Sequence, residues 1–184
     1  AGYSRGGSDR LLVLHYDQAA QRLTPLFEKG QSRALDLLVD REGQLVVAGA
    51  CYAPRTRDDT YVLRLSPQGR VLWERAPLDG GTGIDVARSI IETQAGHYLL
   101  AGHSSSYAEG ARREKLWADL LNRDGERQWP EPLFYGHRFA DRAHRLAQLG
   151  PDRVVAAGVT HTAGRERDAE CWLVGLNTTI GNEE

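Results

Sequence analysis

The sequence predicts an all-β fold made of four-stranded β-propeller-type blades, and two observations carry that prediction. Short apolar or alternating runs follow one another along the chain, and a unit of roughly 50 residues repeats. With 184 residues, of which 41% are hydrophobic, the chain is long enough to bury a core. The runs are too short for the apolar stripe of a helical solenoid, so helix is disfavoured.

The repeating unit is clearest between Asp59 and Ser104. It contains strand-like runs joined by the tight-turn sequences Ser-Pro-Gln-Gly and Gln-Ala-Gly-His. Glycine at such turns supplies the positive φ that a tight reversal needs. We therefore expect an antiparallel meander with strands at Tyr61–Ser66, Val71–Leu78, Ala87–Thr93 and Tyr98–His103.

Other parts of the chain repeat this unit. The run that begins at Asp59 aligns with the run that begins at Lys115, which places Gly69 on Gly125 and Trp73 on Trp129. The other half of the unit recurs around three Ala-Gly pairs, at 48–49, 101–102 and 157–158. Four strands in a repeat of this length are typical of a propeller blade and exceed a leucine-rich or ankyrin repeat.

We expect one domain, residues 1–184, with thirteen strands and about three and a quarter blades. Its parts are a partial blade at 9–28, blades at 34–78 and 86–134, and a partial blade at 142–177. Single-chain propellers have about 4–8 blades, so the expected ring is incomplete. Two copies could close it head to tail as a homodimer, or a sister chain or a longer propeller could complete it, because bare strand edges are normally covered.

Composition excludes several classes of protein. The formal net charge of −2 gives no bulk attraction to nucleic acid, and no apolar run approaches the roughly 18 residues of a membrane span. Cys51 and Cys171 form no CxxC pattern, and their spacing leaves a disulfide between them open. Ala1 and the absence of methionine indicate a trimmed N-terminus, as removal of a signal peptide or of an expression tag would leave.

The central unit also has a recognisable series of motifs. It combines an Asp and an aromatic residue, a glycine turn, a tryptophan, a Gly-Gly link, Asp-x-Ala-x-Ser-Ile, a second glycine turn and an Ala-Gly close, at Asp59, Tyr61, Gly69, Trp73, Gly80, Gly81, Asp85, Ala87, Ser89, Ile90, Gly96, Ala101 and Gly102. This series resembles the units of secreted bacterial propeller-type repeat domains over nearly the whole chain, although the first unit lacks a counterpart of Trp73. The resemblance implies a propeller fold and a periplasmic or secreted location, and it implies no particular activity.

The strongest functional signal is the charged connection between the second and third strands of each unit, at 54–59, 109–115 and 163–170. Equivalent loops of a propeller emerge on one face, so we expect one rim that carries Arg55, Arg57, Arg112, Arg113, Arg165 and Arg167. Acidic residues are interleaved, and the simpler interpretation is a solvated rim that resists aggregation. The functional interpretation is docking of an acidic protein or polyanion, which arginine can hold in a bidentate manner.

Motifs for catalysis, metals and phosphates are weak. His103 and His161 end equivalent strands and could line a common pocket, although ordinary polar strand ends explain them equally. No HExxH pattern occurs, and the sequence predicts no metal site and no cofactor. The glycine-rich link 79–83 lacks the Lys-Ser/Thr ending of a phosphate-binding loop, and no Gly-x-Ser-x-Gly elbow is present.

Two further sets of residues are expected to be structural. Trp73 and Trp129 share a repeat position, which favours packing between blades over a stacking platform for bases or sugars. Asp85 and Asp141 precede equivalent strands, with Arg88 and His144 also equivalent, and we expect hydrogen bonds or ion pairs there that lock blade to blade.

These observations predict a non-enzymatic scaffold or protein-recognition module that presents charged loops on one rim. Its expected partner is a protein or a second chain that completes the propeller, and not nucleic acid. Two alternatives stay open. The chain could be an accessory or cofactor-holding subunit of an exported enzyme, or it could be a carbohydrate-binding propeller.

Overall fold

The protein is all-β wherever the computed structural model describes it, at residues 2–4, 9–53, 57–78, 83–106, 114–136, 140–161 and 169–179. These ranges contain no helix, as the sequence predicts. Their fourteen strands are β1 Gly2–Ser4, β2 Arg10–Asp17, β3 Arg22–Gly30, β4 Ser32–Val39, β5 Leu45–Ala53, β6 Arg57–Leu65, β7 Val71–Arg75, β8 Asp85–Glu92, β9 Tyr98–Ser104, β10 Lys115–Leu121, β11 Leu133–Tyr135, β12 Asp141–Gln148, β13 Arg153–His161 and β14 Ala169–Asn177.

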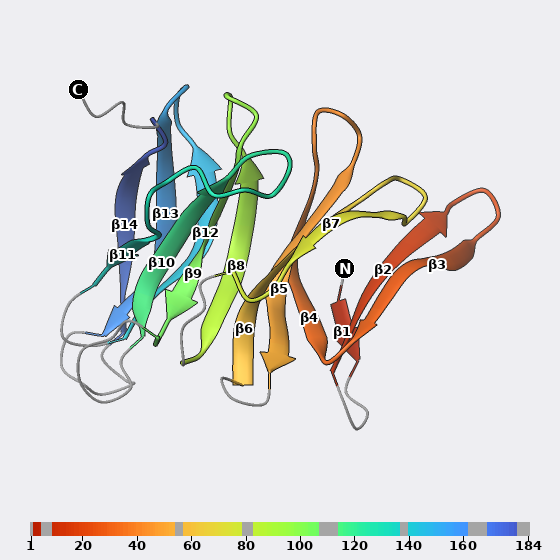
Figure 1. The fold of residues 1–184 in the computed structure, drawn as a ribbon, viewed down its shortest axis with the longest axis horizontal. Helices are drawn as coiled ribbons and strands as arrows, with labels where there is room; N and C mark the ends of the chain where they lie inside the picture. The colour runs from red at the N-terminus through yellow and green to blue at the C-terminus, as the bar shows by residue number, and fades with distance from the viewer. Residues whose placement is uncertain are drawn as a thin grey trace.

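The strands form four antiparallel sheets in which sequence neighbours pair. The N-terminal sheet has the order β1-β2-β3, the second sheet β4-β5-β6-β7, the third sheet β8-β9-β10-β11 and the C-terminal sheet β12-β13-β14. Figure 1 shows the four sheets side by side in chain order, with the N-terminal sheet (red) at one end and the C-terminal sheet (blue) at the other. The predicted four-stranded meanders are confirmed, and the described residues form no closed ring.

Each pair of neighbouring sheets buries one apolar cluster, because successive side chains of a strand point to opposite faces. In the second sheet, Val46 and Val62 pack toward the third sheet, whereas Val47 and Leu63 pack toward the N-terminal sheet. A third cluster, which includes Leu99, joins the third sheet to the C-terminal sheet. The sheets are therefore stacked face to face through apolar layers, and each inner sheet is covered on both faces.

Tight turns close one end of the sheets, which we call the turn end. The turns after β4, β6, β8 and β10 contain the predicted glycines in left-handed conformation, with φ of +77° at Gly43, +84° at Gly69, +82° at Gly96 and +76° at Gly125. At the opposite end, which we call the loop end, β5, β9 and β13 finish and β6, β10 and β14 begin (Figure 1).

The repeated Ala-Gly pairs have a common structural cause. The first strand of the second, third and C-terminal sheets has one β-bulge, between Ala34 and Asp36, Ala87 and Ser89, and Ala143 and Arg145. Opposite the bulge of β8, a Cβ atom on Gly102 would overlap the carbonyl oxygen of Val86, and the same overlap arises at Gly49 and Gly158. Only glycine fits there. The extra residues of the three bulges are Leu35, Arg88 and His144.

The strands differ from the sequence-based expectation in two respects, and the structure also decides the open question of a disulfide. Strand β1 was not expected, and it raises the number of described strands above thirteen. In the third sheet the last strand is β11 and does not include Trp129, because Pro130 and Pro132 have no N–H to donate to a neighbouring strand. Trp129 nevertheless packs against the cluster between the third and C-terminal sheets. Cys51 and Cys171 are both free thiols.

A lock between the first strands of neighbouring sheets exists, but not at Asp85. The carboxylate of Asp85 accepts a hydrogen bond from the Ser106 hydroxyl, which lies in the same repeat rather than in a neighbouring one. The first strands of successive sheets are joined instead by the residue that follows each bulge. Asp36 Oδ2 accepts from Ser89 Oγ and from the Ile90 N–H, both at 3.0 Å.

Candidate functional site

The predicted arginine rim lies largely outside the described residues. Arg55, Arg112, Arg113, Arg165 and Arg167 fall outside them, and Arg57 is described only as the first backbone residue of β6. The strands that flank the three charged connections all finish or begin at the loop end. The attachment points are therefore on one side of the molecule, and the rim itself stays a prediction.

The two predicted histidines have different surroundings. His103, in β9, is buried, and its Nδ1 accepts a hydrogen bond from Arg88 Nε at 3.2 Å. His161, the last residue of β13, has its Nδ1 3.0 Å from the carbonyl oxygen of Ala140. His103 lines a cleft that His161 does not line, so the two histidines do not form one pocket there.

That cleft lies at the loop end between the second and third sheets and has a volume of about 300 Å³. Its walls come mainly from β4 and β8 and the residues just before β8. Apolar side chains and polar side chains both line it, namely Leu35, Ile84 and Val86, and Arg33, Asp58, Arg88 and His103. A few polar groups set among apolar ones are the usual lining of small-ligand sites.

Two arginines at this end have carboxylate partners. Arg33 Nη2 lies 2.5 Å from Asp58 Oδ2, and Arg33 Nε lies 3.8 Å from Asp9 Oδ2. Arg142, in the first strand of the C-terminal sheet, forms an ion pair through Nε with Glu114 Oε2. The charges of Arg33 and Arg142 are thus balanced within the protein.

Arg88, the bulged residue of β8, differs from both. It is half-buried, and it forms no ion pair with any carboxylate in the part of the chain that the structure describes. Its Nε donates to His103, and in the same part its Nη groups have no hydrogen-bond partner. Burial lowers the pKa of the Arg88 guanidinium, Arg142 and Arg33 lower it further, and Glu114 opposes them. Since arginine stays protonated, the cleft contains a partly desolvated positive charge.

His103 is neutral and holds Arg88 in place. Burial lowers the pKa of His103 to about 4; Arg88, Arg142 and His144 lower it as well, while Glu114 opposes them. Because Nδ1 accepts from Arg88, the ring proton is on Nε2, which lies 3.9 Å from Glu114 Oε1. His103 therefore fixes the direction of the guanidinium without adding charge.

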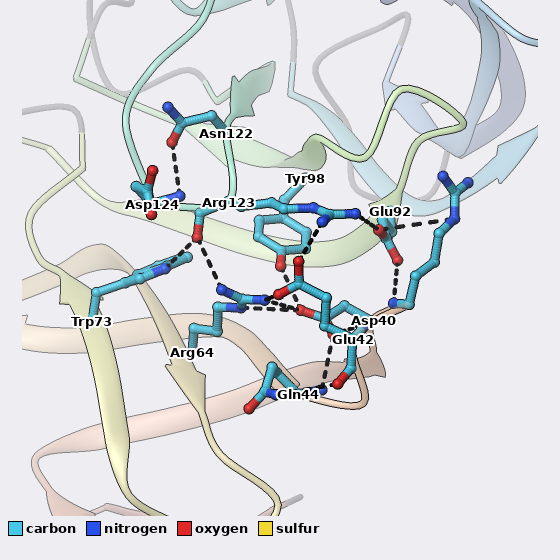
Figure 2. A network of polar contacts seen from close by, with 11 residues as sticks. Asp40, Glu42, Gln44, Arg64, Trp73, Glu92, Tyr98, Asn122, Arg123 and Asp124 are labelled. Carbon is cyan, nitrogen blue, oxygen red and sulfur yellow. Dashed lines mark hydrogen bonds and ion pairs between the residues drawn. The ribbon is translucent and has the colours of Figure 1, made fainter.

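The turn end of the same sheet interface is built differently. Asp40 and Arg64 are only 5% and 7% exposed. Figure 2 shows Asp40 Oδ2 accepting from Arg64 Nη2 at 2.7 Å, Arg64 Nε at 3.0 Å and the Tyr98 hydroxyl at 2.7 Å. Burial alone would raise the pKa of Asp40, but the hydrogen bonds from Tyr98, the Gln44 N–H and Arg64 lower it. Arg64 Nη2 also donates to Glu42 Oε2 at 2.6 Å.

Trp73 extends this turn-end network into the third sheet. Its Nε1 donates to the carbonyl oxygen of Arg123 at 2.7 Å, and its ring centroid lies 6.2 Å from that of Tyr98 (Figure 2). A Cβ on Gly125 would lie 3.0 Å from the Trp73 ring. The predicted packing role of Trp73 is confirmed, and the turn end is a structural joint in which Asp40 and Arg64 compensate each other.

Sequence reasoning treated Arg88 only as a structural residue and did not single out Arg33 or Asp58. The available signal was chemical divergence at one repeat position. The three bulges contain leucine, arginine and histidine, at Leu35, Arg88 and His144, and each of these residues follows an alanine that pairs with a glycine of the next strand. A position that changes its chemistry beside a constant alanine and glycine is a candidate for a local role.

Other kinds of site find little support. The residues placed by the structure contain no group of three or more His, Cys, Asp or Glu side chains able to hold a metal ion. Among the same residues, no helix is long and apolar enough to span a membrane.

Comparison with known proteins found no matching protein-family model and no matching curated protein. The functional argument therefore depends on the geometry of the cleft.

Proposed function

We propose that this protein is an exported, propeller-type recognition module that binds an acidic partner at its loop end. The repetition of the sheets supports the propeller interpretation, since three of them have the same bulge and the same close-packed glycine. The hydrogen bonds between first strands support it too. Asp36 of β4 accepts from Ser89 of β8, and Ser89 Oγ in turn accepts from the Leu146 N–H of β12 at 3.2 Å. Such first strands would surround a common axis, as in propeller blades.

The observation that carries the recognition proposal is the cation at the loop end. Arg88 lies beside a cleft without a described carboxylate partner, whereas Arg64 at the turn end is paired with Asp40. An acidic group on a partner would supply the missing counter-charge and accept two parallel hydrogen bonds. The three charged connections attach at the same end and would enlarge the contact.

The experiment uses an array of acidic peptides probed with the full chain. The double variant Arg112→Glu/Arg113→Glu reverses charge at the loop end. The control, Arg22→Glu/Arg70→Glu, makes the same change in charge at exposed arginines of the turn end. We expect peptides to bind the wild type and the control and not the loop-end variant. Equal binding by all three proteins, or binding by none, would overturn the proposal.

We also infer that a second copy covers the outer face of the C-terminal sheet. Leu173 is 70% exposed there, although its repeat equivalents Val62 and Ala118 are 0% exposed between sheets. The opposite end of the molecule also has exposed apolar side chains, at Leu14, Tyr16 and Leu23. Head-to-tail pairing of two copies would bury both surfaces.

Light scattering tests this assembly. We expect a dimer for the wild type and a monomer for Leu173→Lys, because a buried lysine without a partner prevents close packing. Val71→Lys, at an exposed apolar position of the second sheet, is the control that should stay dimeric. A monomeric wild type at about 10 μM would rule out the pairing.

A further inference from the structure

We propose that the cleft between β4 and β8 binds a single carboxylate attached to a small aliphatic group, and that Arg88 is the residue that binds the carboxylate. This inference rests on the proposed function and specifies the ligand chemistry at the same end of the molecule. It concerns the cleft alone and not the charged connections around it.

Arg88 is oriented before any ligand arrives. Its Nε is occupied by the hydrogen bond to His103, which is only 4% exposed and therefore fixed in the interior. A guanidinium held through Nε still has its two Nη groups for a carboxylate. A partly desolvated cation without a counter-ion is energetically unfavourable. Binding of an anion would therefore offset part of the desolvation penalty of Arg88.

The surrounding charges favour a ligand with one negative charge. Arg33 lines the cleft, but Asp58 lies 2.5 Å from it and balances its charge. Asp58 also lines the cleft, so a second negative charge on the ligand would be repelled. A monocarboxylate fits this arrangement better than a phosphate dianion or a dicarboxylate.

The remaining wall favours an aliphatic group. It consists of Leu35, Ile84 and Val86, and the volume of about 300 Å³ is at the lower limit for small-ligand clefts. Leu35 occupies the bulge of β4 that Arg88 occupies in β8. Equivalent positions of two repeats thus supply the apolar wall and the cation, and the corresponding bulge of the C-terminal sheet has His144 instead.

Two sources provide this chemistry, a free branched aliphatic acid and the C-terminal residue of a protein that ends in leucine or valine. Titration calorimetry at neutral pH with the full chain distinguishes them. The probes are isovalerate, isoamyl alcohol, succinate, and a leucine-terminated tetrapeptide with either a free carboxylate or a carboxamide. We expect isovalerate and the free-carboxylate peptide to bind, and the alcohol, succinate and carboxamide to bind at least about 10-fold more weakly. Tighter binding of the peptide than of isovalerate identifies a protein C-terminus as the ligand.

Variants at Arg88 test the assignment of the cation. Arg88→Leu places in β8 the side chain that the bulge of β4 already accommodates, and Arg70→Leu at the turn end is the control. We expect Arg88→Leu to weaken isovalerate binding by at least about 30-fold, Arg88→Lys to weaken it less, and Arg70→Leu to leave it unchanged. Circular dichroism checks that each variant is folded.

The inference is wrong if isovalerate and the peptide fail to bind the wild type at millimolar concentration, or if they bind Arg88→Leu as well as the wild type. These results are separable from the proposed function. Acidic-peptide binding that is lost in Arg112→Glu/Arg113→Glu but kept in Arg88→Leu would place recognition at the charged connections instead of Arg88, and would remove the cleft as a binding site.

Discussion

The two ends of the interface between the second and third sheets differ in how a buried arginine is paired. At the turn end, Arg64 is 7% exposed and receives Asp40 and Glu42 as partners. At the loop end, Arg88 is half-buried and has the neutral His103 as its partner. The same sheet interface thus has a buried arginine with carboxylate partners at one end and, among the described residues, an arginine without one at the other.

This difference separates stability from binding. A buried cation with matched carboxylates and hydrogen bonds is destabilising to disrupt, since either partner alone would be left charged in the interior. A cation such as Arg88, which has no ion pair with a carboxylate among the residues that the structure describes, stabilises the fold little by itself, and an external anion would supply the counter-charge. Changes at Asp40 should therefore affect folding, whereas changes at Arg88 should affect binding.

The largest expected effect is that of Asp40→Ala. It leaves Arg64 and the Tyr98 hydroxyl without the carboxylate that both contact, and we expect a loss of about 3–5 kcal/mol in the free energy of unfolding. Urea denaturation followed by tryptophan fluorescence measures it. Asp124→Ala, at an exposed turn residue, should cost less than about 0.5 kcal/mol. Similar losses in both variants would contradict the structural role of the turn end.

Lowering the pH should decrease the free energy of unfolding, because His103 at the loop end becomes protonated. Its pKa is about 4 in the folded protein and 6.5 in a model peptide, so between these values the unfolded chain binds more protons than the folded protein. Stability is therefore fully present above pH 6.5 and falls until pH 4, by roughly 3 kcal/mol if His103 acts alone. His144, whose pKa is also lowered by burial and by Arg88 and Arg142, acts in the same direction.

The measurement for His103 is a comparison of unfolding free energies between pH 4 and pH 7 for the wild type and His103→Gln. The slope should be smaller in the variant, and His97→Gln, in a turn of the opposite end, should keep the wild-type slope. Ring titration by NMR gives the pKa directly. A normal histidine titration at His103 would contradict a neutral, fixed partner for Arg88.

A pair of glycine substitutions tests the packing of the turn end. Gly43 and Gly125 have nearly the same φ, +77° and +76°, but a Cβ at Gly43 meets nothing within 4 Å whereas one at Gly125 lies 3.0 Å from the Trp73 ring. We expect Gly43→Ala to cost about 1 kcal/mol from backbone strain and Gly125→Ala about 2 kcal/mol, since it also displaces Trp73. Thermal unfolding measures both, and equal costs would show that the Trp73 contact contributes little.

The sequence predicted most features of single sheets, but of the contacts between sheets it predicted only the packing of the tryptophans. Alternating runs located the strands, and the Ala-Gly pairs located the bulges, because both signals are local to one strand or one hairpin. The Asp40 and Arg64 pair and the Arg88 cleft depend on how one sheet packs on the next, which no single strand pattern specifies. The alignment placed the last strand of the third sheet at Trp129, but β11 begins after Pro132. The alignment did not take into account that Pro130 and Pro132 cannot donate a backbone hydrogen bond.

Apart from the control variants, the smallest expected effect on stability is that of Arg88→Leu. It removes the hydrogen bond to His103 Nδ1, which costs roughly 1 kcal/mol, and it also removes a partly desolvated charge that lies near Arg142 and Arg33, which offsets the loss. Leu35 already occupies the equivalent bulge, so the backbone accepts the side chain. We expect a net change within about 1 kcal/mol in urea denaturation.

Arg64→Leu is the matched change at the turn end, with the same two residue types and the same pair of sheets. It should cost at least about 3 kcal/mol, because it leaves Asp40 buried with Tyr98 as its remaining side-chain partner. If both arginines prove equally costly to replace, Arg88 is a structural residue and the contrast between the two ends fails. If only Arg64 is costly, the loop end retains a charged group that folding does not need, and the proposed ligand would account for a cation in that cleft.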